Sequence, residues 1–126
     1  MTACSIPATG ADPVGRIYKI LPRSDWSAAQ ASGRFVGSAV DHADGFIHFS
    51  TAVQAGETAR RHFAGQADLI VLEVEADDLG PTLKWEPSRG GDLFPHLYGP
   101  LAAAQVRAVH EAPLGPDGAP QPGPLL

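Results

Sequence analysis

The chain has 126 residues, of which 14 are glycine and 12 are proline. Nine lysine and arginine residues stand against 14 acidic ones, so the formal charge at neutral pH is −5. An acidic chain without a basic patch is a poor match for a protein that binds nucleic acid through phosphate contacts. No apolar run reaches the roughly 20 residues needed to cross a bilayer. Nucleic-acid binding is therefore unexpected, and a membrane span is excluded.

Glycine and proline gather at the two ends of the chain. The segments Met1–Gly15 and Ala112–Leu126 hold 12 of the 26 such residues, whereas Arg16–Glu111 holds every lysine and arginine. We expect one domain over Arg16–Glu111, flanked by two tails that contribute little to stability. The first tail lacks the basic start and apolar stretch of a secretory signal. Its Cys4 is the single cysteine and has no internal partner, so a cytoplasmic protein is expected.

The pattern of apolar residues and breakers predicts two main helices and five or six strands. The first helix is expected near Asp25–Ser32, and the second begins at Ala52 after a capping box formed by Thr51 and Gln54. The predicted strands are Arg16–Leu21, Phe46–Ser50, Leu69–Val74, Leu83–Glu86, Phe94–Tyr98 and Val106–His110. Leu69–Val74 is a compact apolar run and is expected at the sheet centre. The fold class is therefore α+β, with the strands in one curved sheet.

Two strands carry polar side chains that could form a site. Side chains alternate between the faces of a strand, so His48 and Ser50 share one face of theirs. The same rule puts His96 and Tyr98 together, and the two pairs could meet across a cleft. The alternative is a pair of structural histidines that hold loops together through hydrogen bonds. Tyr18 belongs to the first strand, and alternation predicts that only one of Tyr18 and Lys19 faces a site.

The loop after the fourth strand provides further candidates. Arg89 precedes two glycines, and a guanidinium beside such a flexible backbone can grip phosphate through its planar fork; otherwise it is an exposed turn residue. Glu86 could act as an acid or base beside Trp85, or be an ordinary charge at a strand end. No His-x-x-x-His pair is present, and the acids around His42 are weak support for a metal. No metal site is expected.

Together these segments resemble a bacterial and plant family, domain of unknown function 952. The resemblance rests on ordered motifs: Ile17–Ile20, Trp26, Asp44–Thr51, Leu83–Gly91 and Phe94–Leu101. It extends over nearly the whole predicted domain. The family is similar in turn to the ADP-ribosyltransferase-like fold group, whose curved, split sheet holds NAD in a central cleft.

The resemblance implies NAD as cofactor and a role for each candidate residue. Ser50 and Thr51 match the strand that lies beside the nicotinamide in that group, and Tyr18 stands where a histidine or arginine is usual. In this scheme Ser50 and Thr51 hydrogen-bond the cofactor, and His48 and His96 orient or protonate the ribose. Arg89 binds the pyrophosphate and Tyr98 stacks on a ring. The segment His96–Tyr98 stands where that group carries its catalytic glutamate, so the matching place holds no acid unless Glu86 reaches into the site.

The resulting hypothesis is a small enzyme that transfers ADP-ribose or a ribosyl-linked group to or from a small molecule. An oxocarbenium-like transition state is stabilised by a carboxylate, so the position of Glu86 is decisive. The alternatives are a non-catalytic module for a nucleotide-like ligand or partner, an RNA 2′-phosphotransferase-like enzyme, and a purely structural domain. The enzyme hypothesis predicts one concave pocket lined by His48, Ser50, Arg89 and His96, with an anion position at the start of the helix at Ala52.

Overall fold

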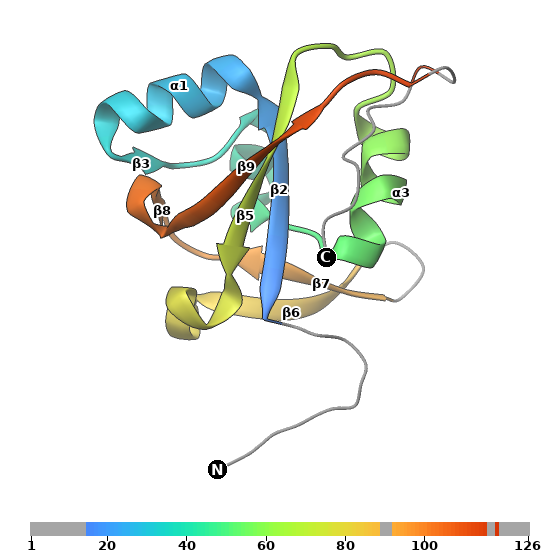
Figure 1. The fold of residues 1–126 in the computed structure, drawn as a ribbon. Coiled ribbons are helices and arrows are strands. Elements are labelled where there is room, and N and C mark those ends of the chain that lie inside the picture. Colours follow the sequence, from blue (N-terminus) through green and yellow to red (C-terminus); the bar gives the residue numbers. More distant parts are fainter. Residues whose placement is uncertain (1–14, 89–91, 116–117, 119–126) are drawn as a thin grey trace.

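The computed structural model describes residues 15–88, 92–115 and 118. Its strands are β2 (Arg16–Pro22), β3 (Arg34–Phe35), β4 (Ile47–His48), β5 (Leu69–Glu75), β6 (Leu83–Ser88), β7 (Asp92–Leu97), β8 (Leu101–Ala102) and β9 (Val106–Ala112) (Figure 1). The α-helices are α1 (Arg23–Ser32), α2 (Ala39–Asp44) and α3 (Ala52–His62), and two 3₁₀ segments span Ala76–Thr82 and Ala103–Gln105. The mixed α+β class predicted from the sequence is confirmed.

The strands form three antiparallel sheets rather than the single curved sheet that was predicted. The sheets have the orders β2-β5-β9, β4-β7-β6 and β3-β8. The apolar run of β5 lies at the centre of the first sheet, as expected. The amide of Phe49 still donates to Pro95 of β7 at 3.0 Å, and the chain then crosses to β2, where Tyr18 and Ser50 exchange two backbone hydrogen bonds of 2.7 and 2.8 Å. This bridge connects the segment that follows β4 to the edge of β2, and among the described residues no strand pairs with that edge.

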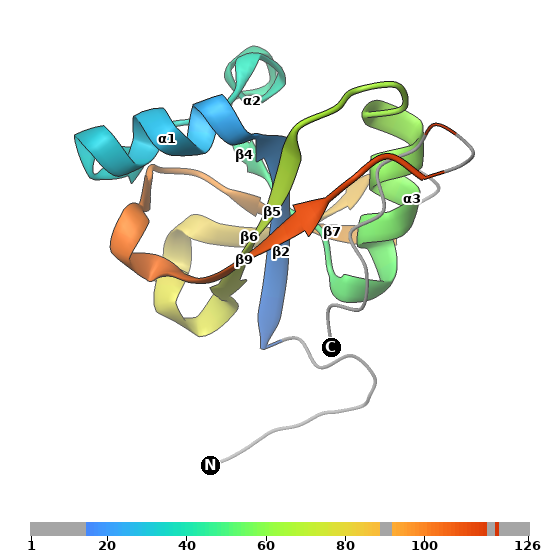
Figure 2. The ribbon, with the colours of Figure 1, turned by 45° about the horizontal axis from the view of Figure 1, so that its top comes forward.

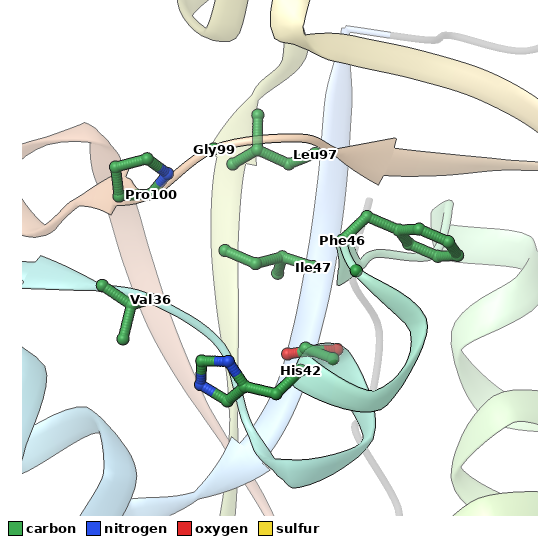
Figure 3. A pocket seen from close by; sticks show the side chains of 9 residues that line it. Val36, His42, Phe46, Ile47, Leu97, Gly99 and Pro100 are labelled. Atoms are coloured by element: carbon green, nitrogen blue, oxygen red, sulfur yellow. The ribbon is translucent and has the colours of Figure 1, made fainter.

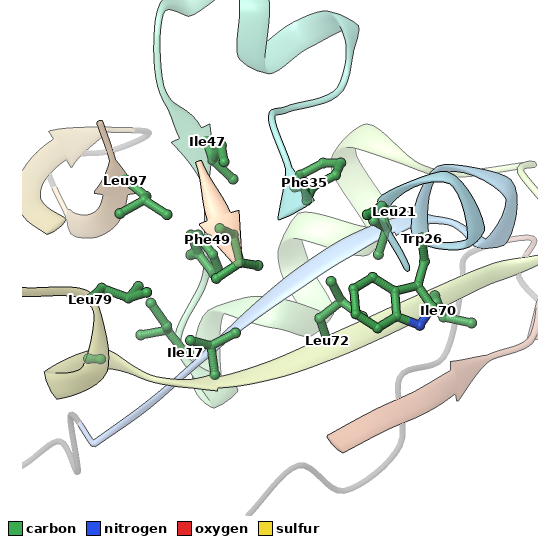
Figure 4. Close-up of a cluster of buried hydrophobic side chains, with 14 residues drawn as sticks. Ile17, Leu21, Trp26, Phe35, Ile47, Phe49, Ile70, Leu72, Leu79 and Leu97 are labelled. Atoms are coloured by element: carbon green, nitrogen blue, oxygen red, sulfur yellow. The ribbon is translucent and has the colours of Figure 1, made fainter. Parts of the chain in front are cut away.

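Strand β2 separates two apolar clusters because its side chains alternate between its faces. Ile17 and Leu21 belong to the cluster that includes Trp26 of α1, together with Phe49 (Figure 4). Tyr18 and Ile20 point the other way, into the cluster under α3. Helices α1 and α3 therefore lie on opposite sides of the main sheet, as Figures 1 and 2 show. Lys19 falls on the same face as Ile17 and Leu21, which places a cation beside the main core.

Helix α3 shows how local sequence fixes an element next to the site. Thr51 accepts a hydrogen bond from the amide of Gln54, and the Gln54 side chain accepts one from the amide of Thr51. The capping box predicted from the sequence is thus confirmed. Ala55 and Ala59 are fully buried, and these small side chains let α3 approach β2 closely. Helix α1 begins at Arg23, two residues before the predicted start, because Pro22 holds the extended conformation that precedes a helix.

Helix α2 is the main element that the sequence analysis missed. An Asp-Gly pair such as Asp44-Gly45 is typical of a turn, but here Asp44 ends a six-residue helix, and the next residue, Gly45, has φ = 88°. That left-handed conformation favours glycine. At the start of the helix, Asp41 accepts hydrogen bonds from the amide and hydroxyl of Ser38. Helix α2 is too short to show helical periodicity, and so are the two-residue strands β3 and β8, which were also missed.

The expected tails lie largely outside the described residues. Strand β9 ends at Ala112, which is buried and pairs with Leu69. None of the helices in the described part of the chain is long and apolar enough to cross a membrane.

Candidate functional site

A pocket of about 580 Å³ runs along the open edge of β2. Strand β2, helices α2 and α3, and strands β4 and β7 all contribute to its wall. Four residues that the sequence analysis singled out line it: Tyr18, His48, Ser50 and His96. Its inner wall also includes Phe49 and Phe94, and one end is closed by His62, Phe63 and Gln66 at the end of α3. The pocket therefore combines two histidines with apolar surface, a combination common in small-molecule sites.

The two histidines are neighbours in one sheet. His48 of β4 and His96 of β7 are direct register partners, so their side chains lie on the same face and their ring centroids are 5.6 Å apart. Phe46 stacks on His96 with a centroid distance of 4.0 Å. The sequence analysis expected these residues to meet across a cleft; they meet on adjacent strands instead, because β4 pairs with β7 directly.

His48 is held by a buried carboxylate. Its Nδ1 lies 2.6 Å from Asp41 Oδ1, and its backbone amide donates to the same oxygen at 3.1 Å. The Lys19 ammonium lies 2.9 Å from the other oxygen, and the side chains of Lys19 and Asp41 are 4% and 1% exposed. Burial alone would raise the pKa of the Asp41 carboxyl, but the hydrogen bond from His48 and the charge of Lys19 hold that pKa well below its ordinary value. Asp41 is therefore an ionised anchor for His48.

Burial acts on the other member of this pair as well. It lowers the pKa of the Lys19 ammonium below its ordinary value, and the charge and hydrogen bond of Asp41 oppose that shift. Each of these two buried charges stabilises the other, because burying either one without its partner would cost free energy. Lys19 and Asp41 thus form a structural pair at the base of the pocket.

His96 is held by a second carboxylate. Its Nδ1 lies 2.8 Å from Glu86 Oε1, and the Tyr98 hydroxyl donates to the same oxygen at 2.7 Å. The hydrogen bonds from His96 and then Tyr98 lower the pKa of the Glu86 carboxyl, and the bond to Glu86 raises that of the Tyr98 phenol. Glu86 is absent from the pocket wall. Glu86 fixes the His96 ring through Nδ1. The other ring nitrogen, Nε2, has no hydrogen-bond partner among the described residues.

The remaining predicted residues have other positions. The Thr51 side chain caps α3, and Tyr98 is 40% exposed and contacts Phe46 rather than the pocket. Ser50 lies in the pocket wall and its hydroxyl donates to Thr58 at 3.1 Å. Arg89 lies outside the described residues, so its proposed contact with pyrophosphate stays a prediction.

One correction concerns the first strand. Tyr18 and Lys19 both line the pocket, although alternation predicted only one of them. The pocket follows the edge of β2 instead of one face, so neighbouring residues can both reach it. Among the described residues no group of three or more histidine, cysteine or acidic side chains could hold a metal ion.

Lys19 and Asp41 are the site residues that sequence reasoning missed. Strand alternation placed Lys19 among core residues, and a lysine in such a position requires an acid nearby. The sequence therefore contained a signal for a buried ion pair at Lys19. Nothing local identified Asp41 as the acid, because it lies 22 residues away along the chain in the unrecognised helix α2.

A second pocket of about 310 Å³ lies beside α2 (Figure 3). Its wall is formed mainly by Val36, His42, Phe46, Ile47, Leu97 and Pro100. Asp41 lines this smaller pocket and not the larger one, and neither His48 nor His96 lines the smaller one. The smaller pocket lacks the paired histidines, so the larger pocket is the candidate site.

Comparison with known proteins agrees with the sequence motifs. Residues 20–109 match the model of the family described as "Protein of unknown function (DUF952)". The chain belongs to the DUF952 family. It is 58% identical to protein CC0527 from Caulobacter crescentus, whose crystal structure superposes with a TM-score of 0.82 over 84% of this chain and 93% of that one.

The solution NMR structure of CC0527 gives the same result. It is 58% identical to this DUF952 chain, with a TM-score of 0.76 over 84% of this chain and 91% of that one. No curated protein matches the chain. The likeness therefore establishes the family and the fold, and the function must be argued from the pocket itself.

Proposed function

We propose that this DUF952 protein binds NAD or a related nucleotide in the β2 pocket and transfers a ribosyl-linked group, with His96 as the general base. One observation carries the proposal: Glu86 fixes Nδ1 of His96 at 2.8 Å, while the ring lines the pocket. A histidine whose far nitrogen is bound by a carboxylate is oriented for proton transfer through its free nitrogen. The free nitrogen here is Nε2.

The proposed reaction is a substitution at the anomeric carbon of the ribose. The bond from this carbon to the nicotinamide nitrogen breaks, and the bond electrons leave with nicotinamide. A hydroxyl or water forms the new bond, and its proton passes to Nε2 of His96. Glu86 is bound to His96 and absent from the pocket wall, so its role here is to position His96 rather than to face the oxocarbenium-like carbon as the sequence hypothesis considered.

The shape of the pocket supports a nucleotide-like ligand. Tyr18 exchanges its backbone hydrogen bonds with Ser50 on the side of β2 away from β5. Backbone groups alternate sides along an antiparallel strand, so the N–H and C=O of Ile20 face the same open side, where Ile20 lines the pocket. A donor and an acceptor at this spacing suit a carboxamide or the edge of a base. Phe63 supplies apolar surface nearby.

The position of Glu86 also supports a second candidate. Without a carboxylate facing the sugar, two adjacent histidines suit transfer of a phosphoryl group, as in the RNA 2′-phosphotransferase-like alternative. The acidic charge of −5 is unfavourable for a long RNA, so a small phosphorylated nucleotide would be the substrate of this second reaction. A non-catalytic module would bind the same ligands without turnover.

The test is incubation of the purified chain with NAD and, separately, with 2′-phosphorylated nucleotides. Release of nicotinamide supports the first reaction, and release of phosphate or its transfer to an acceptor supports the second. His96→Gln should lower the rate by about 10²–10⁴-fold. The matched control is His110→Gln, which removes a histidine that also contacts a carboxylate, Glu73 at 2.9 Å, on β9 outside the pocket. Equal rates for both variants would refute the role of His96.

A further inference from the structure

The two nitrogens of His48 are held by two different acids. Nδ1 contacts Asp41 at 2.6 Å and Nε2 contacts Asp44 at 2.8 Å. Carboxylates only accept hydrogen bonds, so the arrangement is satisfied when both ring nitrogens donate and the ring carries a positive charge. Unlike His96, His48 therefore has no free nitrogen for proton transfer. In this arrangement both ring nitrogens serve as hydrogen-bond donors to carboxylates.

The two acids differ strongly in how firmly they are held. Asp41 is 1% exposed and also contacts Lys19 and Ser38, whereas the Asp44 side chain is 49% exposed. Its ion pair with His48 is partly open to water, and such pairs contribute little stability. Asp44 is also the last residue of α2, where the free backbone groups are carbonyls that repel a carboxylate. Within the described part of the chain, the Asp44 side chain makes no other hydrogen bond or ion pair.

Asp44 and His48 both line the pocket, and their mutual contact is made by Nε2 of His48. A ligand in the pocket can therefore reach the position that the Asp44 carboxylate occupies. A phosphate group offers more negative charge and three acceptor oxygens, and charge-assisted hydrogen bonds to such a group are strong.

We propose that the Nε2 side of His48 is a phosphate subsite, and that the Asp44 carboxylate occupies it in the free protein until a ligand phosphate replaces it. Asp41 keeps the ring in place during the exchange, because it binds Nδ1 and lies on the far side. The contact with Asp44 then makes the subsite selective for phosphorylated ligands, because a neutral ligand cannot displace the carboxylate whereas a phosphorylated one can. This inference rests on the proposed function only in assuming that the pocket admits a nucleotide.

The experiment measures binding to the full chain by calorimetry, with pyrophosphate, AMP and adenosine as probes. Asp44→Asn removes the competing charge and keeps the side-chain shape. AMP and pyrophosphate should then bind roughly three- to tenfold more tightly, while the affinity for adenosine stays unchanged. The matched control is Asp25→Asn, because Asp25 also lines the pocket but makes no hydrogen bond to His48. Its effect on AMP should be smaller than that of Asp44→Asn.

The outcomes separate this inference from the proposed function. Unchanged or weaker binding of AMP and pyrophosphate by Asp44→Asn would overturn the inference, even if NAD is turned over. Equal tightening of adenosine, or equal effects of the two variants, would overturn it as well, since the effect would not be local to a phosphate at His48. Tighter pyrophosphate binding without any turnover of nucleotides would support the subsite and count against the enzymatic function. Absence of binding by every probe to both proteins would overturn the inference.

Discussion

Lys19→Met removes the cation of the buried pair and keeps most of the aliphatic side chain in place. The Lys19 and Asp41 side chains are 4% and 1% exposed, so the variant leaves a carboxylate buried without its ammonium partner. Breaking such a pair costs about 3–5 kcal/mol. Asp41 keeps its hydrogen bonds from His48 and Ser38, which places the expected loss near the lower end, at about 3 kcal/mol.

Urea unfolding followed by circular dichroism measures this loss. With a slope of about 1.5 kcal/mol per molar urea, the midpoint should fall by about 2 M without a change in slope. The matched control is Lys84→Met, because Lys84 is exposed and its nitrogen lies 5.5 Å from the Tyr98 ring centroid. Contacts of that kind contribute about 0.5–1 kcal/mol. The reasoning is refuted if both variants lose the same stability.

A double-mutant cycle isolates the pair itself. Asp41→Asn removes the charge that Lys19 neutralises, so Lys19→Met should cost less in that background than in the natural chain. Contacting residues show coupling of about 0.5–3 kcal/mol, and the burial of this pair predicts a value in the upper half of that range. Additive effects of the two changes would mean that Lys19 does not stabilise Asp41.

Three further predictions concern the core residue Phe49 and the carboxylates of Asp41 and Glu86. Phe49→Ala should cost about 3–5 kcal/mol in urea unfolding because Phe49 is 2% exposed, whereas Val53→Ala, at an 86% exposed position, should cost less than about 0.5 kcal/mol. The folded pKa of Asp41 is lowered, so its stabilisation is present above about pH 4 and is lost as the pH falls; the free energy of unfolding should therefore decline below that pH, and less steeply in Asp41→Asn. Glu86→Gln should lower turnover less than His96→Gln and should shift the pH profile of the rate, whereas an unchanged profile would exclude a positioning role.

The local features of this fold could be read from sequence because they depend on neighbouring residues. The capping box of Thr51 and Gln54 and the apolar run Leu69–Val74 were both recognisable, and each is where it was expected. By strand alternation Ile47 and Phe49 face away from His48 and Ser50, and both are buried. These signals need no knowledge of which strands pair.

The arrangement of the sheets and the positions of the acids in the site depend on which distant segments of the chain pair with each other. A single sequence does not show this pairing. Alternation put His48 and His96 on defined faces, but only the β4–β7 register makes them partners. Asp41 was missed for a similar reason: its role depends on Lys19, 22 residues away, and on a helix too short to have a period. Glu86 was recognised as a candidate, yet its position behind His96 follows from the pairing of β6 with β7.

The most direct test of the central claim, that His48 and His96 together form a ligand site, is NMR of the histidine side chains during titration with ADP-ribose. The imidazole signals of His48 and His96 should shift together and saturate with one dissociation constant. His110 on β9 contacts Glu73 outside the pocket and serves as the internal reference, so its signals should stay in place. If ADP-ribose leaves the His48 and His96 signals unmoved, or moves those of His110 equally, the pocket is not the binding site and the account is contradicted.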